Sequence, residues 1–230
     1  MRDLVRQLAV SVALAATVGV SAACGGSPKA GAAVDEKPLT KAELTKALLR
    51  NADVPGLTVD IGPGLPLFDP DDIVTASPTA CQPIADTMSV RPRHARRAQV
   101  WESLDGVRGA AGTTSGGVVL SSHAEDDARA VVADLKKALP KCGHFSATSA
   151  AGWTYGFDIQ QVPAPAVGDD AVSYLTTNTI APDGKGNVES VVRTGSTLSA
   201  FLLPQGNGEP ASVPEALARK QHERLRAIRG

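Results

Sequence analysis

Aromatic residues and cysteines are both scarce in this chain. Aromatics make up only 3% of its 230 residues, so the core has to rely on valine, leucine, isoleucine and alanine. The chain has three cysteines, and two of them, Cys81 and Cys142, are too few and too far apart for a structural zinc site. The 23 basic and 24 acidic residues nearly balance, so the chain carries no strong field of one sign. This balance argues against a nucleic-acid-binding protein.

Long apolar runs are absent after the N-terminus. Residues 8–23 carry no charge, follow Arg2 and Arg6, and end in small residues just before Cys24. A run of this length is typical of a signal-peptide core and is marginal for a membrane-spanning helix. No second run of similar length follows, so we expect no membrane span in the remainder of the chain.

The residues "SAAC" at 21–24 resemble the lipobox of bacterial lipoproteins, in which the cysteine is lipidated and becomes the first residue of the mature protein. We therefore expect a lipoprotein signal peptide over 1–23 and lipid attachment at Cys24, on the outer face of the plasma membrane. The alternative is an ordinary secretory signal, cleaved near Ala23, that leaves a free thiol. Residues 24–38 are small, polar and broken by proline, which indicates a tether to a single domain over 39–230.

The cysteine count supports this interpretation. If Cys24 is lipidated, Cys81 and Cys142 remain as one pair. An exported protein meets an oxidising compartment, so we expect these two cysteines to form a disulfide. A bridge that closes so long a loop contributes about 4 kcal/mol in the chain-entropy model.

Capping patterns predict where the helices begin. Capping boxes indicate three helix starts, at Thr40–Glu43, Ser122–Glu125 and Ser212–Glu215. The first helix is expected to end near Arg50, and the second covers 123–139 with one apolar stripe. A further helix is expected around 79–88, with Pro83 in its first turn.

Strands are predicted at 97–104, 112–121, 153–160, 170–178, 187–194 and 197–203, with a loop at 105–111. Trp153, Tyr155, Phe157 and Ile159 alternate onto one strand face, and we interpret them as core residues. A sugar or lipid site along this stripe is the alternative. The last three strands are joined by short links and must be antiparallel neighbours. These patterns predict an α+β domain, a mostly antiparallel twisted sheet flanked by helices.

The order of several stretches resembles a known family. These stretches are "LTKAELTKALL" followed by "VPGLTV", then "ACQPIAD", "ADLKKALPKCGHFSA" and "VGDDAVSY". They are similar to the extracellular sensor domain of PknH-type actinobacterial receptor kinases, and to stand-alone lipoproteins that share that domain. The resemblance implies an antiparallel sheet flanked by helices, with a cleft for an unidentified ligand. The chain departs from the kinases by having no kinase domain, no second membrane span and only one candidate disulfide.

Motifs for catalysis are weak. No G-x-S-x-G elbow and no H-E-x-x-H is present, and no motif predicts a metal or a cofactor. A hydrolase would have to assemble a triad from distant segments, such as Ser115 with His94 or His144. His123 and His222 are interpreted as solvated residues.

A basic segment, "RPRHARR", holds Arg91, Arg93, Arg96 and Arg97. It is interpreted as a solvated loop, with contact to an anionic surface as the alternative. The sequence therefore favours a membrane-anchored extracytoplasmic lipoprotein with a sensor-like domain, no catalytic activity and an unknown small-molecule or envelope ligand. A lipid or glycolipid carrier and a secreted serine hydrolase are the alternatives.

Overall fold

The computed structural model describes residues 37–60, 73–109, 112–180, 186–205 and 212–229. These residues form one α+β unit, which confirms the predicted fold class. The helices are α1 (Lys41–Ala47), α2 (Gln82–Thr87), α3 (Glu125–Ala138) and α4 (Glu215–Arg229), with short 3-10 turns η1 (Thr79–Cys81) and η2 (Leu139–Lys141). The strands are β1 (Thr58–Asp60), β2 (Val74–Ser77), β3 (Ala98–Gly109), β4 (Gly112–Ser122), β5 (His144–Ser149), β6 (Thr154–Val162), β7 (Asp170–Asn178), β8 (Gly186–Thr194) and β9 (Thr197–Pro204).

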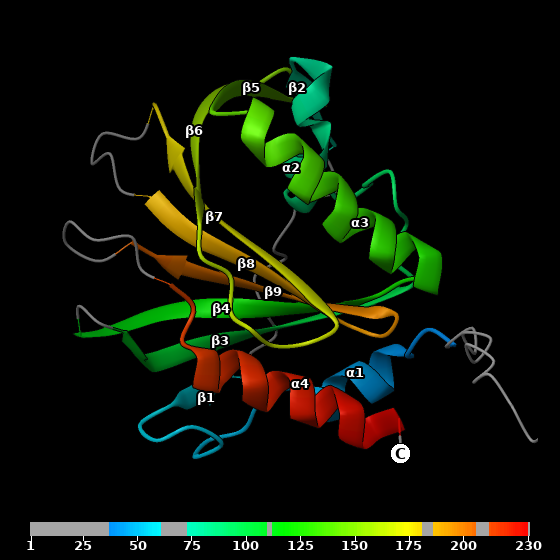
Figure 1. The fold of residues 1–230 in the computed structure, drawn as a ribbon, viewed down its shortest axis with the longest axis vertical. Coiled ribbons are helices and arrows are strands. Elements are labelled where there is room, and N and C mark those ends of the chain that lie inside the picture. The colour runs from blue at the N-terminus through cyan, green and yellow to red at the C-terminus, as the bar shows by residue number, and fades with distance from the viewer. Residues whose placement is uncertain (1–36, 61–72, 110–111, 181–185, 206–211, 230) are drawn as a thin grey trace, which may run out of the picture. The chain divides into compact units, whose positions relative to one another are not determined.

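All nine described strands join one antiparallel sheet, in the order β1-β3-β4-β9-β8-β7-β6-β5-β2 (Figure 1). Strands β7, β8 and β9 are neighbours, as their short connections predicted. The two hairpins on either side of this centre, β3–β4 and β5–β6, extend the sheet in opposite directions. The three-residue β1 and the four-residue β2 form the edges, so little unpaired edge is presented.

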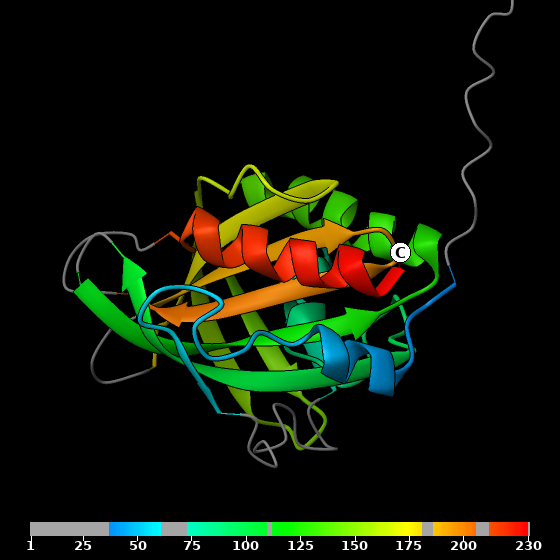
Figure 2. The ribbon, with the colours of Figure 1, turned by 90° about the horizontal axis from the view of Figure 1, so that it is seen from below.

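The helices divide between the two faces of the sheet. Alternation along β8 places Val188 and Val192 in a core with α1 and α4, whereas Val191 faces a second core with α2 and α3. Figure 1 shows α2 and α3 on one side of the strands and α1 and α4 on the other, and Figure 2 shows the same layers from below. The face that carries Val191 is the one that holds the candidate site.

Local capping chemistry accounts for the start of α1. The Thr40 side chain accepts a hydrogen bond from the Glu43 N–H, and the Glu43 carboxylate accepts one from the Thr40 N–H, which confirms that capping box. The helix ends at Ala47, three residues before the predicted end. The α2 region is also as predicted, because Pro83 lies in the first turn, where its missing N–H costs nothing.

The predicted cap of α3 is wrong. Ala124 is its N-cap residue and makes no side-chain cap bond. The hydroxyl of Ser122 instead donates to the Leu39 carbonyl at 2.6 Å, because Ser122 still belongs to β4 and is buried. Three acidic residues in the first turn of α3 remain to complement the helix dipole. The helix therefore begins without the box that its sequence pattern indicated.

One strand boundary needs correction, and two strands were missed. The segment after residue 104, predicted as a loop, continues β3 to Gly109 through an irregularity between Leu104 and Val107. Gly106 lies there with φ +70°, and a side chain at that position would collide with the Gly56 carbonyl. Strands β2 and β5 were not predicted, because each is short and has only two apolar residues, too few for a clear period-two signal.

The interpretation of the aromatic stripe on β6 is only half right. Ile159 is buried, and Phe157 stacks on Phe145 with ring centroids 5.5 Å apart. Trp153 and Tyr155, however, are 68% and 42% exposed. Neither residue belongs to the buried cluster that packs between the sheet and helices α2 and α3, so this core ends before the stripe reaches them.

Candidate functional site

A pocket of about 480 Å³ lies on the sheet face shared with α2 and α3. Its floor is apolar and comes mainly from β4, β8 and β9, with the side chains Val119, Val191, Leu198, Ala200 and Leu202. One wall is α2 with the segment 89–97, a second is α3, and a third is formed by β5 and β6. The pocket exists because α3 covers only part of this face, so the remainder of the floor stays open. Its volume lies within the range of small-molecule sites, ~300–1,000 Å³.

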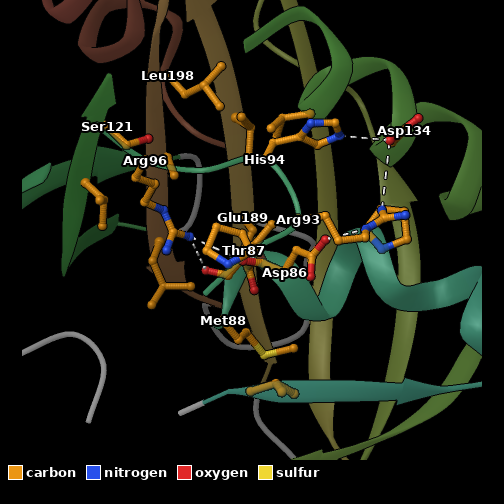
Figure 3. Close-up of a pocket in the computed structure, with 18 of the residues that line it drawn as sticks. Asp86, Thr87, Met88, Arg93, His94, Arg96, Ser121, Asp134, Glu189 and Leu198 are labelled. Atoms are coloured by element: carbon orange, nitrogen blue, oxygen red, sulfur yellow. Dashed lines mark hydrogen bonds and ion pairs between the residues drawn. The ribbon is translucent and has the colours of Figure 1, made fainter. Parts of the chain in front are cut away.

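Figure 3 shows how the polar side chains are set between apolar ones, with Leu198 and Met88 at opposite ends of the view. The central polar residue is Arg96, which donates to the carbonyls of Ser89 at 2.6 Å and Asp86 at 3.2 Å. These carbonyls lie at the C-terminal end of α2, where carbonyl groups lack helical partners. Arg96 thereby fixes the segment 89–97 against α2.

Burial lowers the pKa of Arg96 to about 10, and the nearby carboxylate of Asp86 opposes this change. Arg96 therefore stays cationic at neutral pH. Arg93 pairs with the Asp86 carboxylate at 2.8 Å, whereas Arg91 and Arg97 are exposed. The solvated-loop interpretation of this segment thus holds for Arg91 and Arg97 and is wrong for Arg96, which is a pocket residue.

His94 fastens the same segment to α3. Its Nδ1 lies 3.2 Å from the Asp127 carboxylate and its Nε2 lies 3.1 Å from the Asp134 carboxylate. Ionised carboxylates only accept hydrogen bonds, so both contacts are hydrogen bonds only when the imidazole carries two protons. The His94 hydrogen bond lowers the pKa of Asp134. The two carboxylates lie two turns apart on α3, so His94 clamps one face of the helix.

Ser121 and His123 form a contact in the pocket wall that the sequence did not predict. The Ser121 hydroxyl lies 3.0 Å from Nε2 of His123, and both residues are buried. Burial, reinforced by the positive charge of Arg96, lowers the pKa of His123 to about 4. His123 is therefore neutral at pH 7, and its interpretation as a solvated residue is wrong. His222, the other such residue, is half-buried and bonds the Thr194 hydroxyl at 2.8 Å.

The Ser121–His123 pair lacks the third member of a hydrolytic triad. Within the described residues, no carboxylate hydrogen-bonds to Nδ1 of His123, so the ring lacks the acidic partner that would orient it in a triad. The hypothesised triad on Ser115 is not assembled either. His94 is held by two carboxylates of α3, His144 is bonded to Asp158 at 2.7 Å, and no hydrogen bond in the described part of the chain joins either ring to Ser115.

A buried carboxylate, Glu189, supports the pocket from β8. It accepts hydrogen bonds from the Tyr174 hydroxyl at 2.7 Å, the Thr176 hydroxyl at 3.1 Å and the Thr87 hydroxyl at 3.4 Å. Burial raises the pKa of Glu189. Sequence reasoning missed this residue, although pairing the predicted strands 170–178 and 187–194 places Tyr174 opposite Glu189. The Thr87 bond ties the end of α2 to the sheet.

A disulfide joins Cys81 to Cys142, with Cα atoms 5.6 Å apart, as the cysteine count predicted. Both cysteines are fully buried in the core between the sheet and helices α2 and α3. Cys81 precedes α2 and Cys142 follows α3, so the bridge ties together the two helices that wall the pocket.

Other predictions on export and binding are not decided by this geometry. The expected signal peptide over 1–23 and the lipidated Cys24 lie outside the described residues, as does nearly all of the expected tether over 24–38. Among the described residues, no group of three or more metal-ligating side chains gathers in one place. No helix in that part of the chain is long and apolar enough to cross a membrane.

The chain matches no protein-family model and no curated protein. Its structure is similar to the crystal structure of the extracellular domain of PknH from Mycobacterium tuberculosis, with a TM-score of 0.51 and 15% sequence identity over 83% of this chain and 98% of that one. The two chains share a fold. An uncharacterized protein of Mycobacterium smegmatis, an Rv0999 ortholog, aligns with a TM-score of 0.40 and 14% identity over 82% of this chain and 95% of that one. The PknH-like fold confirms the architecture that the sequence resemblance implied.

Proposed function

We propose that this chain is an extracytoplasmic lipoprotein whose PknH-like domain binds a small ligand in the pocket and has no catalytic activity of its own. The observation that carries the proposal is the pocket itself. It has an apolar floor and a polar wall, and its helices are held in place by a disulfide, by the contacts of His94 with Asp127 and Asp134, and by Glu189. A preformed cavity of this kind is the usual setting for a small-molecule site.

Two features support an extracytoplasmic location. The buried Cys81–Cys142 disulfide is typical of proteins that fold in an oxidising compartment. The shared fold is that of an extracellular domain in PknH. The proposed anchor at Cys24 depends on the sequence alone, and two acyl chains on one cysteine suffice for stable membrane attachment.

The ligand-binding proposal is tested by native mass spectrometry of the protein purified from its host. We expect a non-covalent adduct on the native chain. The variant Ala200→Phe fills the floor of the pocket and should lose the adduct, whereas Ala216→Phe on the exposed side of α4 should retain it. An adduct that survives Ala200→Phe in a folded protein would contradict the proposal.

The anchor is tested separately by fractionating cells that express Cys24→Ala. We expect this variant to leave the membrane fraction, because it has no site for diacylglyceryl transfer. Ser21→Ala is the matched control, since it keeps the cysteine and a small residue three positions before it. A processed Cys24→Ala protein that stays on membranes would overturn the lipoprotein assignment.

A carrier of lipids or glycolipids is the second candidate function. The apolar floor formed by Val119, Leu198 and Leu202 favours it, because such a surface offers few hydrogen bonds to a water-soluble ligand. The same purified protein distinguishes the two candidates. A carrier should release its ligand to acceptor vesicles, whereas a sensor domain should retain its ligand when vesicles are added.

A further inference from the structure

The exposed large hydrophobic side chains of the described residues gather at one end of the pocket. They are Trp153, Tyr155 and Ile180, and they are 68%, 42% and 64% exposed. Soluble proteins leave scattered apolar residues on their surface, so single ones need no explanation. Here all three lie close together, and a cluster of exposed apolar side chains is typical of an interaction surface.

Strand register establishes that location. Phe157 of β6 lies opposite Asn178 of β7, so Tyr155 is level with Ile180, just beyond the paired strands. The Thr179 N–H donates to the Gly156 carbonyl at 2.9 Å, which holds the two segments together at this level. Trp153 precedes Tyr155 by two residues, and its carbonyl accepts from the Ser149 N–H at 2.8 Å. We call Trp153, Tyr155 and Ile180 the apolar rim.

The apolar rim is continuous with the pocket. Tyr155, Phe157, Asn178 and Ser149 all line the cavity, so the rim stands at its β5–β6 end. From there the apolar floor runs through Val191 and Ala200 of the central strands, and the polar side chains Arg96, His123 and Ser121 lie farther along the cavity wall. A ligand in this pocket therefore meets the apolar floor from the rim inward, beside the polar side chains of Asp86, Thr87 and Glu189, and further hydrogen-bonding groups at the other wall.

We infer that the pocket takes a single-chain amphiphile from a lipid surface, with its hydrocarbon chain lying against the apolar rim and floor. This inference rests on the ligand-binding function proposed above and names the class of ligand. The volume of about 480 Å³ lies in the lower half of the small-molecule range, which suits one hydrocarbon chain better than a two-chain lipid. The polar head of the amphiphile meets Ser121, neutral His123 and the guanidinium of Arg96.

The rim residues also suit a lipid surface. Tryptophan and tyrosine have an apolar ring with one polar group, and both concentrate where hydrocarbon meets water. If Cys24 is lipidated as proposed, only the fourteen residues 25–38 of the sequence separate the anchor from the domain. The apolar rim is thus within reach of the lipid from which an amphiphile would be drawn.

Binding is tested with dansylaminoundecanoic acid, a fluorescent single-chain fatty acid, and displacement by lauric acid. We expect saturable fluorescence enhancement that lauric acid reverses. Ala200→Phe should weaken binding of the probe by at least about tenfold, and Ala216→Phe should leave it unchanged. Absence of saturable binding to the native protein would overturn the inference, as would equal binding to a folded Ala200→Phe variant.

The access route is tested by the rate of probe transfer from phosphatidylglycerol vesicles to the protein. The double variant Trp153→Ser, Ile180→Ser removes two exposed side chains, so the fold should be unaffected. We expect transfer to slow by about tenfold while affinity for the free probe changes little, because neither residue lines the pocket. Equal transfer rates would overturn the role of the rim. Arg226→Ser, exposed on α4, is the control.

Different results would contradict the ligand-binding function and the amphiphile inference. If a water-soluble compound is bound to the native protein and lost in Ala200→Phe, while the fatty-acid probe does not bind, the ligand-binding function stands and the amphiphile inference is wrong. If the folded Ala200→Phe variant retains every ligand that the native protein binds, both are wrong.

Discussion

Protonation of His123 should unfold the pocket wall as the pH falls. The ring is 2% exposed and its pKa is lowered to about 4, from an ordinary value of 6.5, chiefly by burial and next by Arg96. In the unfolded chain the ring takes up a proton near pH 6.5, whereas the folded protein resists protonation until about pH 4. The stability that neutral His123 contributes is therefore fully present above pH 6.5 and is lost as the pH falls from 6.5 to about 4. The difference between the two pKa values corresponds to roughly 3 kcal/mol in the free energy of unfolding.

Histidine NMR measures this directly, because the chain has only four histidines. We expect the Cε1–H signal of His123 to stay at its neutral position down to about pH 5. A midpoint near pH 6.5 would refute the reasoning, since it would show that the ring is hydrated or paired with an acid in the folded protein.

Urea unfolding followed by circular dichroism gives the energetic half of the test. Between pH 6.5 and pH 4 the free energy of unfolding should decrease in both proteins. The decrease should be smaller in His123→Gln than in the native protein, by roughly 3 kcal/mol. Glutamine keeps a hydrogen-bonding group beside Ser121 and does not titrate. His144→Gln changes an exposed ring on the far side of the site, whose one hydrogen bond among the described residues is to Asp158, so it serves as the control.

Three further changes test other parts of the fold. Glu102 is fully buried, and burial raises its pKa from 4.5 to about 7. Its ionisation should therefore lower the free energy of unfolding by roughly 3 kcal/mol as the pH rises from 4.5 to 7. Denaturant titrations of Glu102→Gln should not show this pH dependence. Reduction of Cys81–Cys142 should lower the free energy of unfolding by roughly 2–4 kcal/mol, and an unchanged midpoint in urea would contradict a structural bridge. Gly117→Ala places a methyl group within the Trp101 ring and should lower stability by about 1–3 kcal/mol, measured by thermal unfolding.

Local patterns in the sequence predicted most of the elements. The Thr40–Glu43 box and Pro83 marked helix starts, because capping depends only on residues within one turn. Short links required β7, β8 and β9 to be antiparallel neighbours, because a parallel connection needs a long crossover. The Ser122–Glu125 pattern failed, because Ser122 is held in the sheet by the Leu39 carbonyl, a partner 83 residues away.

The candidate site was not predictable in this way. Scarce aromatics and three cysteines are properties of the sequence, and they predicted a largely aliphatic core and the Cys81–Cys142 pairing. Tertiary structure alone decided that α3 leaves part of the sheet uncovered, that Arg96 and His123 become buried in the wall of the resulting pocket, and that Trp153 lies beyond the core. The physical reason is that burial depends on which helix covers which strand, and these contacts join residues far apart in the chain.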